Sequence, residues 1–323
     1  MHTAAVFPGQ GAQYVGMGRE VAHHSAAARE VFRRAAAVLG FDLLALCADG
    51  PEDALRATAN TQPAILVTSL ACLAALPVAA DCAAGLSLGE YTALACAGAI
   101  ELEDAVTLVR LRGQYMQEAC AGRDTMMAAI VGLPAAHVRD VCQRHGALGV
   151  VEPSNFNSPG QIVIGGDAAA VRAALATAMT LGARRAVPLA VSAPFHTSLM
   201  RPAAERLAGD LERARIRDAR IPVFANVTAS PVQAADDVRR ALLAQVASPV
   251  LWEQSVRAMH AAGIARFVEF GPGTTLGSMI RRTVKAELWH VEDLPSRDAT
   301  AAALVRPAGT TAPATASRLG QGG

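Results

Sequence analysis

The chain has 323 residues, of which 52% are hydrophobic and 18% charged, and its formal net charge is +1. This composition is that of a globular protein and excludes an intrinsically disordered one. The small net charge gives no electrostatic reason to expect a nucleic acid or an anionic membrane as partner. A chain of this length can bury a large core, so we expect one large domain with an insertion, or two domains.

The cysteines and the apolar runs indicate a cytoplasmic protein that does not span a membrane. The six cysteines show no CxxC spacing and lie in apolar or helical contexts, which predicts reduced core residues and neither a metal site nor disulfides. Residues 4–7 have no basic segment before them, so no signal peptide is expected. The apolar run 64–80 is slightly short for a span of about 20 residues and favours a buried helix.

The N-terminal part of the chain begins with a strand and continues with helices. Residues 3–7 predict a short buried strand, closed by the turn Pro8–Gln13. Two glycines in this turn allow the backbone to come close to a ligand. The turn does not meet the dinucleotide-binding fingerprint, because Tyr14 occupies the third glycine position. Helices are predicted over 26–39 and 60–76.

The stretch Gly85-Leu86-Ser87-Leu88-Gly89 has the Gly-x-Ser-x-Gly pattern. It lies between a run of small apolar residues and an alanine-rich segment of helical character. A serine on a sharp strand-to-helix turn needs flanking glycines, because a Cβ on either side clashes in so tight a bend. Such a turn aims the hydroxyl at a helix N-terminus, where free backbone N–H groups stabilise an oxyanion. The pattern also arises by chance, so it needs support from other residues.

A helix is predicted over 101–121, where Val106, Val109 and Met116 share an apolar face and Arg112 lies beside it. An arginine in this place is usually a surface residue whose aliphatic stem covers apolar neighbours. If Arg112 points inward instead, its planar fork can pair two hydrogen bonds with a carboxylate. It would then select an acyl group with a free acid at its far end.

Residues 125–191 differ in character from the segments on either side. The order strand-helix-strand-helix-strand predicts a small α+β subdomain inserted into the main domain. Its predicted strands are 126–133, 161–164 and 186–191, its helices are 134–144 and 167–181, and the segment 155–160 is predicted as a turn.

The main domain is predicted to resume near Ser192, so that it comprises 1–124 and 192–298. From Ala299 the chain is rich in Ala, Thr, Pro and Gly, which predicts a disordered tail over 299–323. Between these points the predicted helices are 202–213, 236–246 and 252–261, and the predicted strands are 222–226 and 267–270, the last ending at the turn Gly271-Pro272-Gly273.

Ser87 needs a base, and among the eight histidines His196 is the best placed. It follows the end of a predicted strand, with Pro194 fixing the backbone, and α/β enzymes present catalytic groups at such strand ends. The alternative is a histidine satisfied by backbone groups at a bend. Serine followed by histidine matches the chain order of α/β-hydrolases. No Asp or Glu is an obvious third member of a triad, so either a hidden carboxylate or a backbone carbonyl orients the imidazole.

Motifs spread over residues 4–285 together resemble the malonyl-CoA:acyl-carrier-protein transacylase family of fatty acid and polyketide synthesis. They occur in the family's order and spacing. They are Phe7-Pro8-Gly9-Gln10-Gly11-Ala12-Gln13, Gly85-Leu86-Ser87-Leu88-Gly89-Glu90-Tyr91, Leu111-Arg112-Gly113, Asn155-Phe156-Asn157-Ser158-Pro159-Gly160-Gln161, Phe195-His196 and Gly271-Pro272-Gly273. The resemblance implies an α/β fold in which an α/β-hydrolase-like large subdomain carries an inserted ferredoxin-like small subdomain.

The resemblance also implies a role for each site residue. Ser87 attacks the thioester of malonyl-CoA with His196 as general base, and the malonyl-serine ester is passed to the phosphopantetheine thiol of an acyl carrier protein. The backbone N–H groups of Gln10 and Leu88 form the oxyanion hole, and Arg112 binds the malonyl carboxylate. The chain itself is expected to bind no cofactor and to be a monomer.

Three positions bear on how closely the chain follows the family. Leu86 stands where many members have histidine, and a leucine variant also occurs. Leu251 stands where bacterial fatty-acid enzymes usually carry glutamine, and its backbone carbonyl is expected to accept from His196, which would account for the missing acid. Phe195 resembles the malonyl-selective polyketide enzymes, because its ring fills space that an α-methyl group needs. One methyl group is worth only ~1–3 kcal/mol of discrimination.

Other functions are also compatible with these residues. A transferase for another CoA-linked extender unit, an acyl-thioester hydrolase that clears carrier-bound chains, and a non-catalytic docking module remain open. The sequence does not distinguish a fatty acid pathway from a polyketide pathway, and it does not identify the carrier protein.

Overall fold

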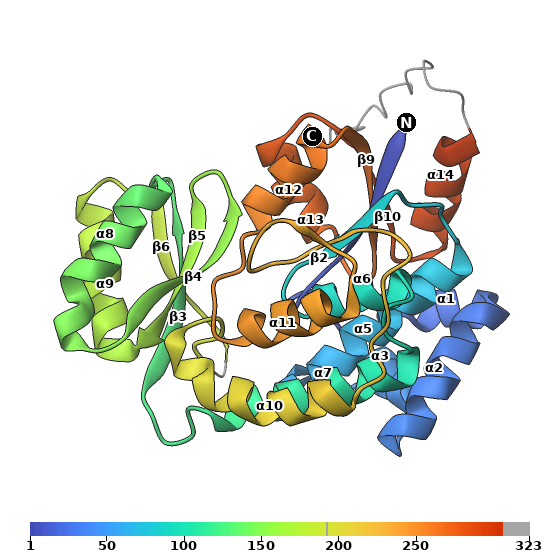
Figure 1. The fold of residues 1–323 in the computed structure, drawn as a ribbon, viewed down its shortest axis with the longest axis horizontal. Helices are drawn as coiled ribbons and strands as arrows, with labels where there is room; N and C mark the ends of the chain where they lie inside the picture. The colour runs from blue at the N-terminus through green and yellow to red at the C-terminus, as the bar shows by residue number, and fades with distance from the viewer. Residues whose placement is uncertain (192, 306–323) are drawn as a thin grey trace, which may run out of the picture.

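The computed structural model describes residues 1–191 and 193–305, and Figure 1 shows that they form two β-sheets, each with its own helices. The larger sheet has six strands in the order β10-β9-β1-β2-β7-β8, and only the pair β7 and β8 is antiparallel. Its strands are β1 (His2–Phe7), β2 (Cys82–Gly85), β7 (Val223–Phe224), β8 (Pro231–Val232), β9 (Ile264–Phe270) and β10 (Glu287–Val291).

Helices cover both faces of the larger sheet, which explains why β1 is apolar along most of its length. Ala5 and Phe7 belong to the core on one face, and Ala4 and Val6 belong to the core on the other. The first face is covered by α1 (Arg19–His24), α2 (Ala26–Leu39), α3 (Leu43–Asp49), α4 (Glu52–Arg56), α5 (Thr58–Ala75), α6 (Gly89–Cys96), α7 (Leu102–Glu118), α10 (Arg201–Arg213) and α11 (Ala235–Val246). The second is covered by α12 (Trp252–Ala261) and α13 (Thr275–Thr283).

The smaller sheet is antiparallel and lies beside the larger unit, in green in Figure 1. Apolar residues on one of its faces pack against its two helices, whereas Met127 and Val163 join the core of the larger unit. The order of its strands is β4 (Val151–Ser158), β5 (Gln161–Asp167), β3 (Thr125–Val131) and β6 (Arg185–Leu189). Its helices are α8 (Ala135–His145) and α9 (Ala168–Thr180), with a short 3-10 turn at Gly146–Leu148; a second such turn, Ser198–Met200, precedes α10.

Several predicted elements need correction. The segment 155–160 is not a turn throughout, because β4 continues to Ser158 and only Pro159 and Gly160 form the connection. Pairing with β5, in which Phe156 lies opposite Ile162, outweighs the turn-like composition of the segment. The helix α13 and the strand β10 were not predicted.

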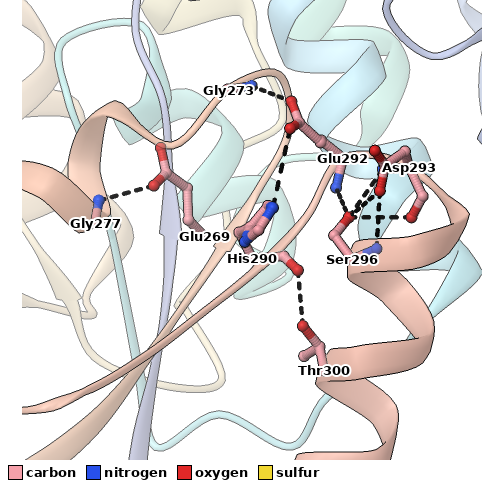
Figure 2. A network of polar contacts seen from close by, with 8 residues as sticks. All are labelled: Glu269, Gly273, Gly277, His290, Glu292, Asp293, Ser296 and Thr300. Atoms are coloured by element: carbon pink, nitrogen blue, oxygen red, sulfur yellow. Dashed lines mark hydrogen bonds and ion pairs between the residues drawn. The ribbon is translucent and has the colours of Figure 1, made fainter. Parts of the chain in front are cut away.

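A network of polar contacts holds the turn between β9 and α13, as Figure 2 shows. The carboxylate of Glu269, at the end of β9, accepts a hydrogen bond from the N–H of Gly277 at 2.8 Å. Glu292, which follows β10, accepts from the N–H of Gly273 at 2.6 Å. Side-chain oxygens that accept hydrogen bonds at the start of a helix satisfy N–H groups that have no partner within it. The glycine-rich turn is therefore fixed from both sides.

The predicted tail over 299–323 is wrong at its start, because α14 (Leu294–Val305) is a helix. Asp293 accepts from the N–H of Ser296 at 2.8 Å in its first turn, and the buried Thr300 donates to the carbonyl of His290 at 2.7 Å (Figure 2). The alanines that suggested disorder also favour a helix once such contacts hold it against a sheet. The rest of the predicted tail, 306–323, lies outside the described residues.

Candidate active site

Ser87 lies in the tight turn between β2 and α6. Its φ is +53°, in the left-handed region that only glycine adopts freely. A Cβ on Gly85 would overlap the carbonyl of Gly89, and a Cβ on Gly89 would overlap the carbonyl of Phe7. Both glycines are therefore required by close packing of the backbone, which is the physical basis of the Gly-x-Ser-x-Gly pattern at this position.

The structure places His196 against Ser87, with 2.6 Å between Ser87 Oγ and His196 Nε2. The imidazole is buried, and its pKa is lowered to about 3, chiefly by burial and next by the nearby charge of Arg112. Backbone carbonyls of Gln245 and Ser248 oppose the shift. A neutral imidazole at physiological pH can accept a proton from the serine hydroxyl, as a general base must.

A backbone carbonyl, and not a carboxylate, orients the imidazole. His196 Nδ1 lies 2.9 Å from the carbonyl oxygen of Gln245, so Nδ1 carries the proton and Nε2 is left to accept from Ser87. The prediction that Leu251 supplies this carbonyl is wrong. The Leu251 carbonyl accepts from the N–H of Ser255 at 2.9 Å in the first turn of α12.

Arg112, on α7, points inward and is 2% exposed, so it is not the surface residue that its position allowed. Its Nη2 donates to Ser87 Oγ at 3.0 Å and to Gln245 Oε1 at 2.9 Å, and its Nη1 donates to Gln62 Oε1 at 2.8 Å. Burial lowers the pKa of Arg112. Within the described part of the chain, no carboxylate forms an ion pair with it. Buried charges are normally paired, so this guanidinium is left with capacity for an anion.

The loop after β1 lies against the serine turn, because β1 and β2 are parallel neighbours with Phe7 opposite Gly85. Gln10 from this loop and Leu88 at the start of α6 both line the cavity at Ser87. Neither backbone N–H of these two residues donates to an acceptor among the described residues. Two free N–H groups beside a nucleophile are what an oxyanion hole requires.

The cavity that contains Ser87 has a volume of about 230 Å³ and lies between the two sheets. Phe195, next to His196, is mostly buried and forms part of the wall. Asn157 on β4 also faces the cavity, and its buried side-chain oxygen has no hydrogen-bond partner within the described residues. The smaller sheet and the segment that follows β6 contribute Met127, Asn155, Asn157, Val163, Leu189 and Val191 to the lining.

Four buried polar residues around the nucleophile were not predicted as site residues: Gln62, Glu90, Asn226 and Gln245. Gln245 carried a detectable signal, because it occupies the buried face of α11 in line with Val238 and Leu242. A polar side chain in an apolar stripe usually has a specific partner. The other three carry no such local signal.

Glu90 is a buried carboxyl group whose Oε2 accepts from Asn226 N at 2.9 Å and Gln245 Nε2 at 2.8 Å. Burial raises its pKa from 4.5 to about 7, and these hydrogen bonds and Arg112 oppose the shift. The folded-state pKa lies above the unfolded value. Its contribution to stability is therefore fully present below the unfolded pKa and is lost as the pH rises through about 7.

Glu90→Gln should remove this pH dependence, because the amide cannot ionise. We expect the free energy of unfolding of the variant, relative to wild type, to increase by about 3 kcal/mol from acid to mildly alkaline pH. Urea unfolding at one acid and one mildly alkaline pH measures this increase, with Glu205→Gln on the exposed surface of α10 as the control. A difference that does not change with pH would show that the proton on Glu90 is not coupled to folding.

Two general properties of the described residues bear on the kind of site. They contain no cluster of three or more side chains able to hold a metal ion. None of their helices has the length and apolar character needed to cross a membrane.

A serine on a strand-to-helix turn, paired with a buried histidine and with free N–H groups beside it, defines a site for acyl transfer through a serine. A family model described as "Acyl transferase domain" matches residues 5–317. The malonyl CoA-acyl carrier protein transacylase of Bacillus subtilis is 42% identical over 86% of this chain and 89% of its own length. That of Escherichia coli K12 is 43% identical over 87% of this chain and 92% of its own. The chain belongs to the malonyl CoA-acyl carrier protein transacylase family.

Solved structures agree with this assignment. The transacylase of Coxiella burnetii has a TM-score of 0.92 at 39% identity and covers 95% of this chain and 98% of its own. A malonyl-transacylase solved in complex with its type II polyketide acyl-carrier protein has a TM-score of 0.90 at 40% identity. The match covers 92% of this chain and 98% of that one. The mixed α/β fold with two sheets is therefore that of the family, and the resemblance seen in the sequence is confirmed.

Proposed function

We propose that this protein transfers a malonyl group from malonyl-CoA to the phosphopantetheine thiol of an acyl carrier protein, through an ester on Ser87. The observation that carries the proposal is Arg112, a buried guanidinium 3.0 Å from the nucleophile whose partners are all neutral. A malonyl group carries a free carboxylate two bonds from its thioester carbonyl carbon. The names of the relatives, malonyl CoA-acyl carrier protein transacylases, support the same substrates.

The first half-reaction forms the ester. The Ser87 hydroxyl attacks the thioester carbonyl carbon of malonyl-CoA while its proton passes to His196 Nε2, and the carbonyl oxygen becomes an oxyanion. The N–H groups of Gln10 and Leu88 stabilise that oxygen. When the carbonyl re-forms, the carbon–sulfur bond breaks, and the CoA sulfur leaves with the proton from His196. Arg112 holds the malonyl carboxylate throughout, which fixes the acyl group beside Ser87.

The second half-reaction repeats these steps with a different thiol. The phosphopantetheine thiol of the carrier gives its proton to His196 and attacks the ester carbonyl, so that Ser87 leaves and takes the proton back. The side-chain amide oxygen of Asn157, on the cavity wall, is unpaired and can accept from N–H groups of the phosphopantetheine arm, which CoA and the carrier protein share. Phe195 narrows the cavity next to His196, which favours malonyl over an α-methyl analogue by ~1–3 kcal/mol.

We also infer that the two sheets are an α/β-hydrolase-like large subdomain, residues 1–124 and 192–298, and a ferredoxin-like small subdomain, residues 125–191. The mostly parallel order of the larger sheet, with the serine turn after β2, supports the first assignment. The antiparallel order β4-β5-β3-β6 with two helices packed on one face supports the second.

The pH dependence of serine acylation tests the state of His196. Its folded-state pKa is about 3, so the imidazole stays neutral across the physiological range. We expect the rate constant for acylation by malonyl-CoA to change less than about twofold as the pH is lowered from near 8 to near 5.5. The Glu90→Gln variant, measured in the same way, serves as the control, because it lacks the nearby carboxyl group whose pKa is about 7. If the rate constant of both proteins fell with a midpoint close to the pKa of free histidine, the His196 imidazole would be solvated and the proposed state of this residue would be wrong.

Carrier loading, as opposed to hydrolysis, separates the proposal from its main alternative. The protein is incubated with malonyl-CoA with and without a holo acyl carrier protein, and malonyl-carrier and free malonate are both measured. We expect malonyl-carrier to form much faster than malonate. Rapid release of malonate without carrier loading would identify a thioester hydrolase, and no acylation at all would identify a non-catalytic module.

A further inference from the structure

Asn226 is a fully buried side chain that lies behind the nucleophile and has no part in the mechanism above. It follows β7, whose carboxyl end lies beside that of β2 because Phe224 pairs with Ala84. Its Oδ1 accepts from the backbone N–H of Ser87 at 2.6 Å, and its Nδ2 donates to the carbonyl of Gly85 at 2.7 Å. The side-chain amide of Asn226 therefore joins two backbone groups, the N–H of Ser87 and the carbonyl of Gly85.

The main chain at Ser87 needs such support. A non-glycine residue at a φ of +53° is strained and persists only where its surroundings hold it. The N–H of Ser87 is held by Asn226, and its carbonyl accepts from Gln245 Nε2 at 2.9 Å. These contacts act on the backbone atoms of the nucleophile and not on its hydroxyl.

Asn226 is itself fixed by its neighbours. Its backbone N–H donates to Glu90 Oε2 at 2.9 Å, and its backbone carbonyl accepts from the N–H of Leu251 at 2.8 Å. The orientation of its amide is determined as well, since the oxygen faces the donor at Ser87 and the NH₂ group faces the acceptor at Gly85. The amide is thus a rigid element that can fix the position of Ser87.

We propose that Asn226 is a positioning residue for Ser87: by bridging the Ser87 N–H and the Gly85 carbonyl, its amide holds the hydroxyl in line with His196 and the oxyanion hole. A shift of about 1 Å in the position of a reacting atom can lower a rate about 100-fold. The inference rests on the proposed nucleophilic role of Ser87. A purely structural role, in which Asn226 only satisfies two buried backbone groups, predicts loss of stability without a specific loss of rate.

The test measures how fast Ser87 is acylated in a single turnover. Asn226→Ala should lower the rate constant with malonyl-CoA about 100-fold, and with acetyl-CoA by the same factor, because the nucleophile is displaced whichever acyl group is bound. The dissociation constant for malonyl-CoA should change less than about twofold, since Arg112 is untouched. Thr300→Val removes another buried donor to a backbone carbonyl, far from the site. It should leave both acylation rate constants and the dissociation constant for malonyl-CoA unchanged.

A second variant covers the case in which Asn226→Ala does not fold. Asn226→Asp keeps the shape and the acceptor for Ser87 N–H, but the ionised group cannot donate to the Gly85 carbonyl, whereas its protonated form can. The rate of this variant, relative to wild type at the same pH, should therefore recover as the pH is lowered. Glu90 accepts from the Asn226 N–H, Arg112 and His196 contact Ser87, and Tyr91 lies against Arg112; these titratable or charged groups are present in both proteins.

A fluorophosphonate that labels active serines gives a readout independent of malonyl-CoA. Asn226→Ala should slow this labelling by a similar factor. Acylation and labelling within about threefold of wild type would overturn the proposal, as would a loss confined to malonyl-CoA or an equal loss of malonyl-CoA binding. If malonyl-CoA does not acylate the wild-type protein but the fluorophosphonate labels Ser87, the proposed substrate is wrong, and the labelling rates of the variants still decide the role of Asn226.

Discussion

Ser87→Ala is expected to lower the rate of malonyl transfer about ten-thousandfold to a millionfold, because it removes the atom that carries the acyl group. His196, Arg112 and the two backbone N–H groups remain, but they have no nucleophile to act on. Intact-protein mass spectrometry after mixing with malonyl-CoA should show one malonyl group on the wild-type protein and none on the variant. Carrier loading should be lost to the same extent.

The matched control for this substitution is Ser255→Ala. Ser255 is also a buried serine, but its hydroxyl donates to the carbonyl of Leu251 within the first turn of α12. We expect its removal to leave malonyl transfer unchanged. Malonylation that persists in Ser87→Ala would mean that another residue carries the acyl group.

Arg112→Ala should reduce kcat/KM for malonyl-CoA by a factor of about 150 to 5,000 and leave acetyl-CoA within about tenfold of its value. The malonyl carboxylate would be buried without a partner, which costs about 3–5 kcal/mol, whereas an acetyl group has no carboxylate to lose. Steady-state kinetics on both thioesters measure the two ratios. Arg112→Lys should recover only part of the malonyl activity, because an ammonium group does not reproduce the planar fork.

The comparison of the two thioesters also tests what else Arg112 does. Its Nη2 donates to Ser87 Oγ in the absence of substrate, and its guanidinium bridges Gln62 and Gln245. If these contacts were its main role, malonyl and acetyl transfer would fall by equal factors. Equal losses would therefore contradict recognition of the carboxylate and assign Arg112 to maintenance of the site.

Much of the fold could be predicted from the sequence where hydrophobic periodicity is strong and local. The helices expected at 26–39 and 252–261 have those bounds in the structure. The change of character at residue 125 coincides with the start of β3. Ser87, His196 and Arg112 were singled out because a turn, a strand end and a helix face each leave a trace in the local sequence.

The orienting carbonyl could not be predicted in the same way. Every residue has a backbone carbonyl, so only the three-dimensional path of the chain decides that Gln245, and not Leu251, lies at His196 Nδ1. Asn226 was missed for a related reason. Its contacts with Ser87 join residues 139 positions apart in the chain, and no local pattern records them.

Transfer of label from the protein to a carrier tests the malonyl-serine intermediate itself. The protein is mixed with malonyl-CoA labelled in the malonyl group and is then separated from CoA. One portion is digested to locate the label, and holo acyl carrier protein is added to the other portion. We expect the label on Ser87, followed by its movement to the phosphopantetheine thiol of the carrier with little free malonate. Label on another residue, or label on Ser87 that goes to water and not to the carrier, would contradict the proposed function.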